Sequence, residues 1–192
     1  MRIISVLGGP GSGKGTQCGL LRTTFMCAHL SVGDVLRAEA AKPDSPYTSI
    51  IEDNIRNGRV GPKEITVGVL QSHIKEALDN GIQTFFLDGF PRKLDQAEYF
   101  EEIVGPIDLV IVFDCPEVML TQRLLQRSRA DDDTDNIKRR IETFKATTSH
   151  VVKKYSDMGK VVELKTDTEV EDIFIRLQQL LKEHDMELEP RN

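Results

Sequence analysis

The sequence has few cysteines and no long apolar run. Both features exclude classes of protein. Its three cysteines, Cys18, Cys27 and Cys115, are far apart and form no C-x-x-C pair. That spacing argues against a disulfide framework or a cysteine-bound metal. No apolar run reaches the roughly 20 residues of a membrane-spanning helix, and the run after Arg2 is too short for the core of a signal peptide. We therefore expect a protein of the cytoplasm, or of the nucleus as well.

Positive charge is also in the minority, with 25 Lys and Arg against 31 Asp and Glu and a net charge of −6. A general nucleic-acid binder is usually basic, so any anion must be bound by a local cluster of cations. The scattered histidines are expected to be surface or structural residues: His29, His73, His150 and His184. A length of 192 residues suits a single domain with small insertions.

Short apolar runs alternate with stretches of helical period. Runs rich in Val, Ile and Phe predict buried strands at 3–7, 84–87, 109–113 and 161–164, with a weaker one around 27–30. Amphipathic helices are predicted at 65–78, 118–125 and 170–181. Strands that are apolar on both faces and alternate with helices indicate an α/β fold with a parallel five-stranded sheet between two helical layers.

Three segments depart from this alternation. Residues 31–62 lie between the second and third predicted strands and carry short helical patterns of their own. The polar stretch "SRADDDTD" at 128–135 separates two helical patterns. Both are predicted to be excursions from the sheet, and the tail at 185–192 is predicted to be frayed.

A glycine loop, defined here as residues 8–16, follows the first predicted strand. It reads Gly8-x4-Gly13-Lys14 and precedes a helical pattern, which is the context of a phosphate-binding loop. Glycines let several backbone N–H groups face one anion, and the N-terminus of the helix adds positive potential. In the usual pattern, a Ser or Thr that binds magnesium follows the lysine directly. Here Gly15 follows Lys14 and Thr16 comes next, so the hydroxyl is shifted by one residue. The plainer alternative is a tight turn with a surface lysine.

The rest of the chain decides between classes of phosphate-binding proteins. A regulatory GTPase would need D-x-x-G and N-K-x-D, and neither string occurs. Arginines instead follow the predicted strands and helices: Arg37, Arg92, Arg123, Arg127, Arg129 and Arg140. Arginine is the fork-shaped donor for phosphate oxygens, so the sequence predicts a site for several phosphates.

At this point the sequence resembles the nucleoside monophosphate kinases, the family of adenylate kinases and UMP-CMP kinases. The matching stretches are "GGPGSGKGTQ", "HLSVGDVLRAE", "FFLDGFPRKLDQA", "RLLQRSRADDD" and "IKRRIETF". They keep the family's order over about residues 1–184. The resemblance implies one P-loop kinase domain over 1–192, a monophosphate-binding insertion at 31–62 and a short lid at 127–136. Only Ser128 separates Arg127 from Arg129, which makes the lid shorter than in close relatives.

The resemblance also implies roles for individual residues. Gly11, Gly13, Lys14, Gly15 and Thr16 would hold the phosphates of the donor ATP, with Arg127 nearby. Arg37 and Arg92 would clamp the acceptor, beside Ser31, Val32, Gly89 and the base-reading Gln96. The catalytic set would be Lys14, Arg92, Arg123, Arg129 and Arg140, of which Arg140 is preferred to its neighbour Arg139. Asp88 would hold Mg²⁺ through water. The partners would be ATP and a nucleoside monophosphate, with no nucleic acid or membrane, and the protein would be a monomer.

The identity of the acceptor stays open between two branches of the family. Val32 stands where adenylate kinases tend to have Thr and UMP-CMP kinases Ala, and it has no hydrogen bond to offer a base. Gln96 has both a donor and an acceptor, so it could meet adenine or, rotated, a pyrimidine. The stretch from Arg37 to Thr66 looks more like the UMP-CMP branch, which we favour over AMP. Two further alternatives are a non-catalytic nucleotide-binding module and a P-loop kinase for another small acceptor.

Overall fold

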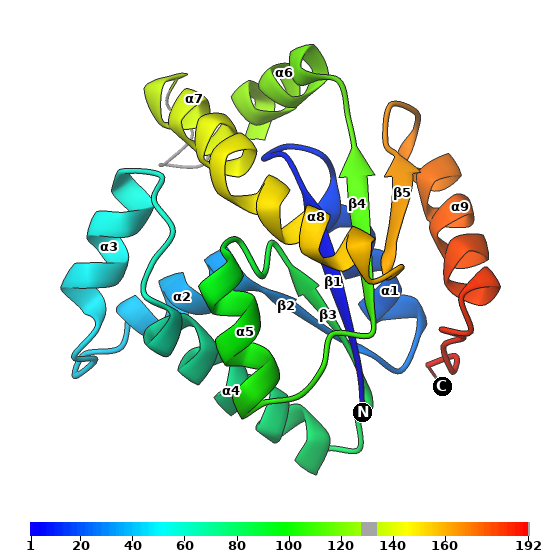
Figure 1. The fold of residues 1–192 in the computed structure, drawn as a ribbon, viewed down its shortest axis with the longest axis horizontal. Helices are drawn as coiled ribbons and strands as arrows, with labels where there is room; N and C mark the ends of the chain where they lie inside the picture. Colours follow the sequence, from blue (N-terminus) through cyan, green and yellow to red (C-terminus); the bar gives the residue numbers. More distant parts are fainter. Residues whose placement is uncertain (128–133, 192) are drawn as a thin grey trace.

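The computed structural model describes residues 1–127 and 134–191, built around a five-stranded parallel sheet (Figure 1). Its strands are β1 Arg2–Gly8, β2 Ala28–Ser31, β3 Thr84–Asp88, β4 Leu109–Asp114 and β5 Val161–Lys165. They lie in the order β2-β3-β1-β4-β5. Every predicted strand is present, with each end within one residue of its predicted position. The predicted parallel sheet is therefore confirmed.

Helices cover both faces of the sheet. They are α1 Lys14–Thr24, α2 Val32–Ala40, α3 Thr48–Arg56, α4 Lys63–Asp79, α5 Leu94–Ile103, α6 Glu117–Arg127, α7 Thr134–Thr143, α8 Ser149–Asp157 and α9 Val170–Glu183, with a π-helical segment η1 Phe144–Thr148 between α7 and α8. The predicted helices at 65–78, 118–125 and 170–181 lie inside α4, α6 and α9. Helix α4 ends before Gly81, whose φ of +83° suits glycine at the end of a helix.

The alternation of side chains along β1 explains the two layers. Ile3 and Leu7 face a core shared with α4, α5 and α8, whereas Ile4 and Val6 face a core shared with α1 and α9. Because successive side chains of a strand point to opposite faces, a strand with apolar residues on both faces needs cover on both sides. The three-layer α/β architecture is confirmed.

The insertion at 31–62 consists of α2, α3 and the turn that leads into α4 (Figure 1). The predicted short lid at 127–136 falls largely outside the described residues, and it stays a prediction. No helix within 1–127 or 134–191 has the length and apolar character to cross a membrane.

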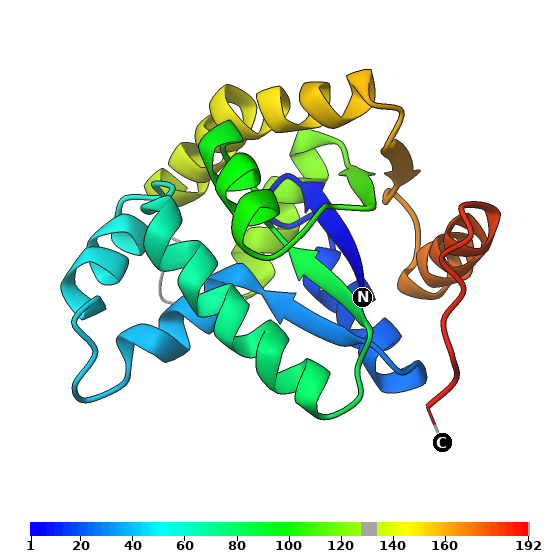
Figure 2. The same ribbon diagram turned by 60° about the horizontal axis from the view of Figure 1, so that its bottom comes forward.

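The C-terminal segment differs from the frayed tail that the sequence predicted. Met26 donates its N–H to Glu189 O at 2.7 Å, and Arg191 donates its own to Thr24 O at 2.9 Å. Met186 and Leu188 pack against the core beneath α1 and α9. Figure 2 shows this segment extending from the end of α9 without helix or strand. The prediction is therefore wrong for residues 185–191.

Candidate active site

The carboxyl ends of the strands meet at one edge of the sheet, where the candidate site lies. The register pairs Val6 with Asp88 in β1 and β3, and Ser31 with Asp88 in β2 and β3. The loops after these strands therefore converge, as expected for an open parallel sheet. They line a cavity of about 960 Å³, which is near the upper end of the usual range for ligand sites.

The glycine loop wraps the amine of Lys14. Gly8, Gly11 and Gly13 have φ values of +147°, +86° and +91°, in the region that favours glycine. Lys14 Nζ donates to Gly8 O and Gly9 O, both at 3.0 Å, and it lies 3.3 Å from Ser12 Oγ. The loop residues predicted to hold the donor phosphates all line the cavity: Gly11, Gly13, Lys14, Gly15 and Thr16.

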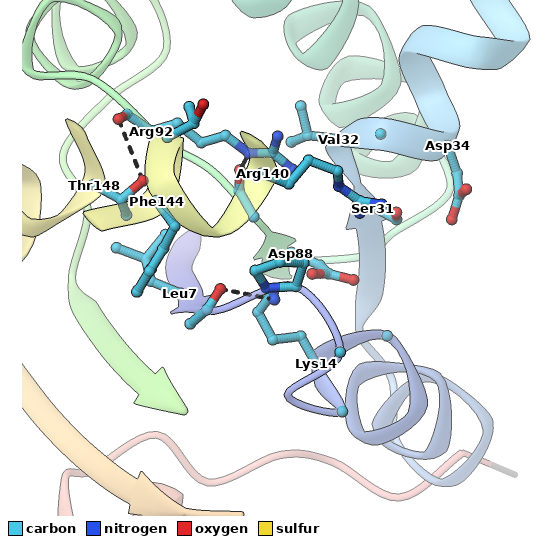
Figure 3. Close-up of a pocket in the computed structure, with 18 of the residues that line it drawn as sticks. Leu7, Lys14, Ser31, Val32, Asp34, Asp88, Arg92, Arg140, Phe144 and Thr148 are labelled. Atoms are coloured by element: carbon cyan, nitrogen blue, oxygen red, sulfur yellow. Dashed lines mark hydrogen bonds between the residues drawn. The ribbon is translucent and has the colours of Figure 1, made fainter. Parts of the chain in front are cut away.

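Two arginines approach Lys14 from other elements (Figure 3). Arg92 follows β3 and donates its Nε–H to Gly89 O at 2.8 Å, and Arg140 comes from α7. Burial lowers the pKa of Lys14 to about 8, and repulsion from both arginines adds to the shift. Burial also lowers the pKa of Arg92, with repulsion from Arg140 as the next cause. The site is thus a cluster of confined positive charges, and such a cluster favours a polyanionic ligand.

Asp88 supplies the opposite charge at the end of β3. Its Oδ2 lies 3.2 Å from His29 Nε2, and both side chains are largely buried. A side chain at Gly15 would begin 3.4 Å from the same carboxylate oxygen. His29, expected to be a surface or structural residue, is a cavity residue that the sequence did not assign to the site. The sheet register, which pairs His29 with Phe86 two residues before Asp88, is what brings them together.

The residues predicted for the acceptor also line the cavity: Ser31, Val32, Arg37, Gly89, Arg92 and Gln96. Arg37 Nη2 forms an ion pair with Asp34 Oδ1 at 2.6 Å. Gln96 is buried; its Oε1 accepts from Arg92 N at 3.1 Å, and its Nε2 donates to Gly61 O at 3.3 Å. The amide of Gln96, the predicted base reader, is therefore oriented by the backbone, and Val32 is also buried.

Arg123, predicted to surround the transferring phosphoryl group, is held by contacts on one side of the cavity, and its role stays a prediction. It lines the cavity, but its Nη1 donates to Thr166 O at 3.0 Å and lies 3.5 Å from Cys115 Sγ. These contacts hold it against the turn between β5 and α9. The side chain of Arg127 and all of Arg129 lie outside the described residues, so their predicted roles stay predictions.

The sequence analysis assigned no site role to several residues that line the cavity. Asn54 and Thr66 belong to the insertion side, Thr143 and Thr148 follow Arg140, and residues 167–170 come from the turn after β5. Only residues 57–62, "NGRVGP", could have been found from the sequence, because their glycines and proline predict a turn. A threonine that lines a cavity has no such sequence pattern.

Comparison with known proteins agrees with this geometry. The chain matches the family model described as adenylate kinase over residues 6–160. It is 40% identical over 185 residues to the uridylate kinase of Saccharomyces cerevisiae, an alignment that covers 94% of this chain and 91% of that protein. It is also 40% identical to the UMP-CMP kinase of Lentinula edodes, covering 89% and 81% of the two chains. The adenylate kinase isoenzyme 1 of Caenorhabditis elegans is 38% identical, covering 90% and 83%.

Proposed function

Because the chain belongs to the adenylate kinase family, we propose that it transfers the γ-phosphoryl group of ATP to a nucleoside monophosphate. The observation that carries this proposal is the meeting of Lys14, Arg92 and Arg140 at one cavity, beside a glycine loop. A cavity of about 960 Å³ offers one end next to the glycine loop and another inside the insertion. ATP would occupy the first end, and the acceptor the second.

The proposed chemistry needs no general base. A phosphate oxygen of the acceptor is already anionic at neutral pH, and it attacks the γ-phosphorus of ATP. A new P–O bond forms while the bond from the γ-phosphorus to the bridging oxygen breaks, which gives two nucleoside diphosphates. Catalysis then consists of positioning and of neutralising charge, which suits a site built from Lys14, Arg92 and Arg140.

Exclusion of water is the second requirement, because water at the γ-phosphate would waste ATP. Residues of α2, α3 and 58–62, in the insertion at 31–62, line the cavity, and this segment would cover the acceptor. Closure of such segments over the substrates is a common way to exclude water, for which the adenylate kinase lid is a standard example. The short lid at 127–136 would cover the donor in the same way.

Magnesium is the cofactor that this chemistry implies. Among residues 1–127 and 134–191, no group of three or more His, Cys, Asp or Glu side chains could hold a metal ion. Mg²⁺ usually keeps several waters and binds through one or two carboxylates together with the phosphates of the substrate. Asp88, a single carboxylate beside the glycine loop, fits that mode through water. The ion would add positive charge at the phosphates of ATP.

For the acceptor we propose UMP or CMP, which would place the reaction in pyrimidine nucleotide synthesis. The support is the apolar surface of Val32 where adenine would seek a hydrogen bond, together with the names of the relatives from S. cerevisiae and L. edodes. AMP is the second candidate, because the relative from C. elegans is named an adenylate kinase. We further propose a monomer that works in the cytoplasm or nucleus, where the buried thiols of Cys18 and Cys27 stay reduced.

A parallel assay of acceptors tests the proposal. ADP release from ATP should be measured with AMP, UMP, CMP, dCMP and GMP under identical conditions, with Lys14→Ala as the inactive control. We expect kcat/KM for UMP or CMP to exceed that for AMP by at least about tenfold, which corresponds to roughly 1.4 kcal/mol of discrimination. A clear preference for AMP would overturn the acceptor assignment alone. ADP release in the absence of any acceptor, or no ADP release with any of the five monophosphates, would overturn the proposed kinase activity.

A further inference from the structure

Helix α7 carries Arg140, and it rests on the turn that closes the insertion at 31–62 (Figures 1 and 2). Thr143 Oγ1, from the last residue of α7, donates to Gly58 O at 3.0 Å. Asn136 Nδ2, near the start of the same helix, lies 3.5 Å from Ile55 O at the end of α3. Both ends of α7 therefore contact the insertion, more than 80 residues earlier in the chain.

Gly58 makes this contact close. Its φ is +62°, and a Cβ there would lie 2.8 Å from Asn136 Oδ1, 3.2 Å from Arg140 Cγ and 3.3 Å from Arg139 Cβ. The backbone of the turn thus packs directly against the stem of Arg140. A side chain at this position would have to move the Asn136 side chain and press on the stems of Arg139 and Arg140, and the φ of +62° there also disfavours any residue but glycine.

We propose that Thr143 and Gly58 are positioning residues, through which the insertion fixes Arg140 at the transferring phosphoryl group. This inference rests on the proposed function. A long arginine side chain can adopt many rotamers in solution, so a catalytic arginine gains from a fixed stem. The hydrogen bond from Thr143 anchors the helix, and the bare backbone of Gly58 supports Arg140 Cγ. Because residues 31–62 would also cover the acceptor, the contact ties the placement of Arg140 to the segment that would hold the acceptor.

The first test removes only the hydroxyl group of Thr143, the hydrogen-bond donor in this contact. Thr143→Val keeps the shape of the side chain and loses the hydrogen bond to Gly58 O. We expect kcat to fall about tenfold while KM for ATP changes less than about twofold, because small misplacements of a catalytic group act mainly on the transition state. Thr143→Ser keeps a hydroxyl and should recover kcat to within about twofold of the wild type. The matched control is Thr147→Val, whose hydroxyl donates only to Thr143 O within the helical stretch and whose kcat should be near wild type.

The second test asks whether Thr143 acts through Arg140. In the Arg140→Ala background, Thr143→Val should cause no further loss of kcat, since the residue that it positions is gone. Gly58→Ala reaches the same contact from the insertion side, and it should show the same lack of additivity. Thermal melting of every variant confirms that it is folded. If either Thr143→Val or Gly58→Ala does not fold, the other one is enough for the double-mutant cycle with Arg140→Ala.

The outcomes separate the two proposals. An active wild type in which the single losses multiply in the double variants, or in which Thr143→Ser fails to restore kcat, overturns the positioning role and leaves the kinase intact. A wild type that phosphorylates no nucleoside monophosphate overturns the proposed function and this inference with it.

Discussion

At the scale of single residues, Lys14 is the cation with the most unusual surroundings. Its amine donates to Gly8 O and Gly9 O, so the glycine loop holds the amine within the loop itself, where the phosphates of ATP would bind. Its pKa is lowered to about 8 because burial disfavours the charged form. The same burial strengthens any interaction with a phosphate once ATP is bound, since charges interact more strongly where water is excluded.

This shift predicts a pH dependence of ATP capture. In the protein without ATP, the amine loses its proton as pH rises through about 8, so kcat/KM for ATP should fall about tenfold per pH unit above that value. The phosphates raise the lysine pKa once bound, so kcat should hold to higher pH. Initial rates between pH 6.5 and 10 measure both profiles. Lys14→Arg, which stays charged over this range, should lose the fall near pH 8. A wild-type kcat/KM that is flat to pH 10 would contradict the assignment.

At the scale of elements, the C-terminal segment 185–191 works as part of the fold. It supplies Glu189 O to Met26 N, and Arg191 donates its side-chain Nη2–H to Cys27 O at 3.3 Å. Arg2 Nη1 donates to Glu187 O at 2.8 Å, which ties the segment to the start of β1. The segment therefore covers the chain just before β2, where the core beneath α1 would otherwise meet water.

Removal of residues 185–192 should therefore destabilise the protein without changing its chemistry. Loss of the partly buried Met186 and Leu188 should lower the free energy of unfolding by about 2 kcal/mol, which corresponds to roughly 4–8 °C in the melting temperature. Because no residue of the segment lines the cavity, kcat at 20 °C should stay within about twofold. Calorimetry and the coupled assay measure the two effects. Glu189→Ala, which keeps the backbone contact, is the matched control. An unchanged melting temperature on truncation would mean that the segment adds nothing to the core.

At the scale of the whole molecule, two kinds of feature could be predicted from the sequence. They are elements marked by a regular apolar pattern and turns marked by glycine. The strands follow from runs such as 109–113, and the glycine loop follows from Gly8, Gly13 and Lys14. The contact of His29 with Asp88 and that of Thr143 with Gly58 could not be foreseen. Such contacts join residues 59 and 85 positions apart along the chain, and only the packing of the elements determines them.

The position of Arg123 shows the same limit within the site. A resemblance between sequences assigns an arginine to a phosphate site, but the local hydrogen bonds decide which part of the cavity its guanidinium serves. Arg123 Nη1 donates to Thr166 O at 3.0 Å, in the turn after β5, and nothing in the sequence indicated this contact. Residue type and spacing predict which residues line the site, whereas the contacts of each side chain depend on how the elements pack.

The most direct test of the central claim is a crystal structure with a bisubstrate inhibitor, two nucleosides joined through a chain of phosphates. One nucleoside should lie beside the glycine loop and the other inside the insertion at 31–62. The phosphate bridge should contact Lys14, Arg92 and Arg140, with Arg37 at the acceptor phosphate. A bridge bound away from these four cations, with Lys14 and Arg92 facing elsewhere, would contradict the account.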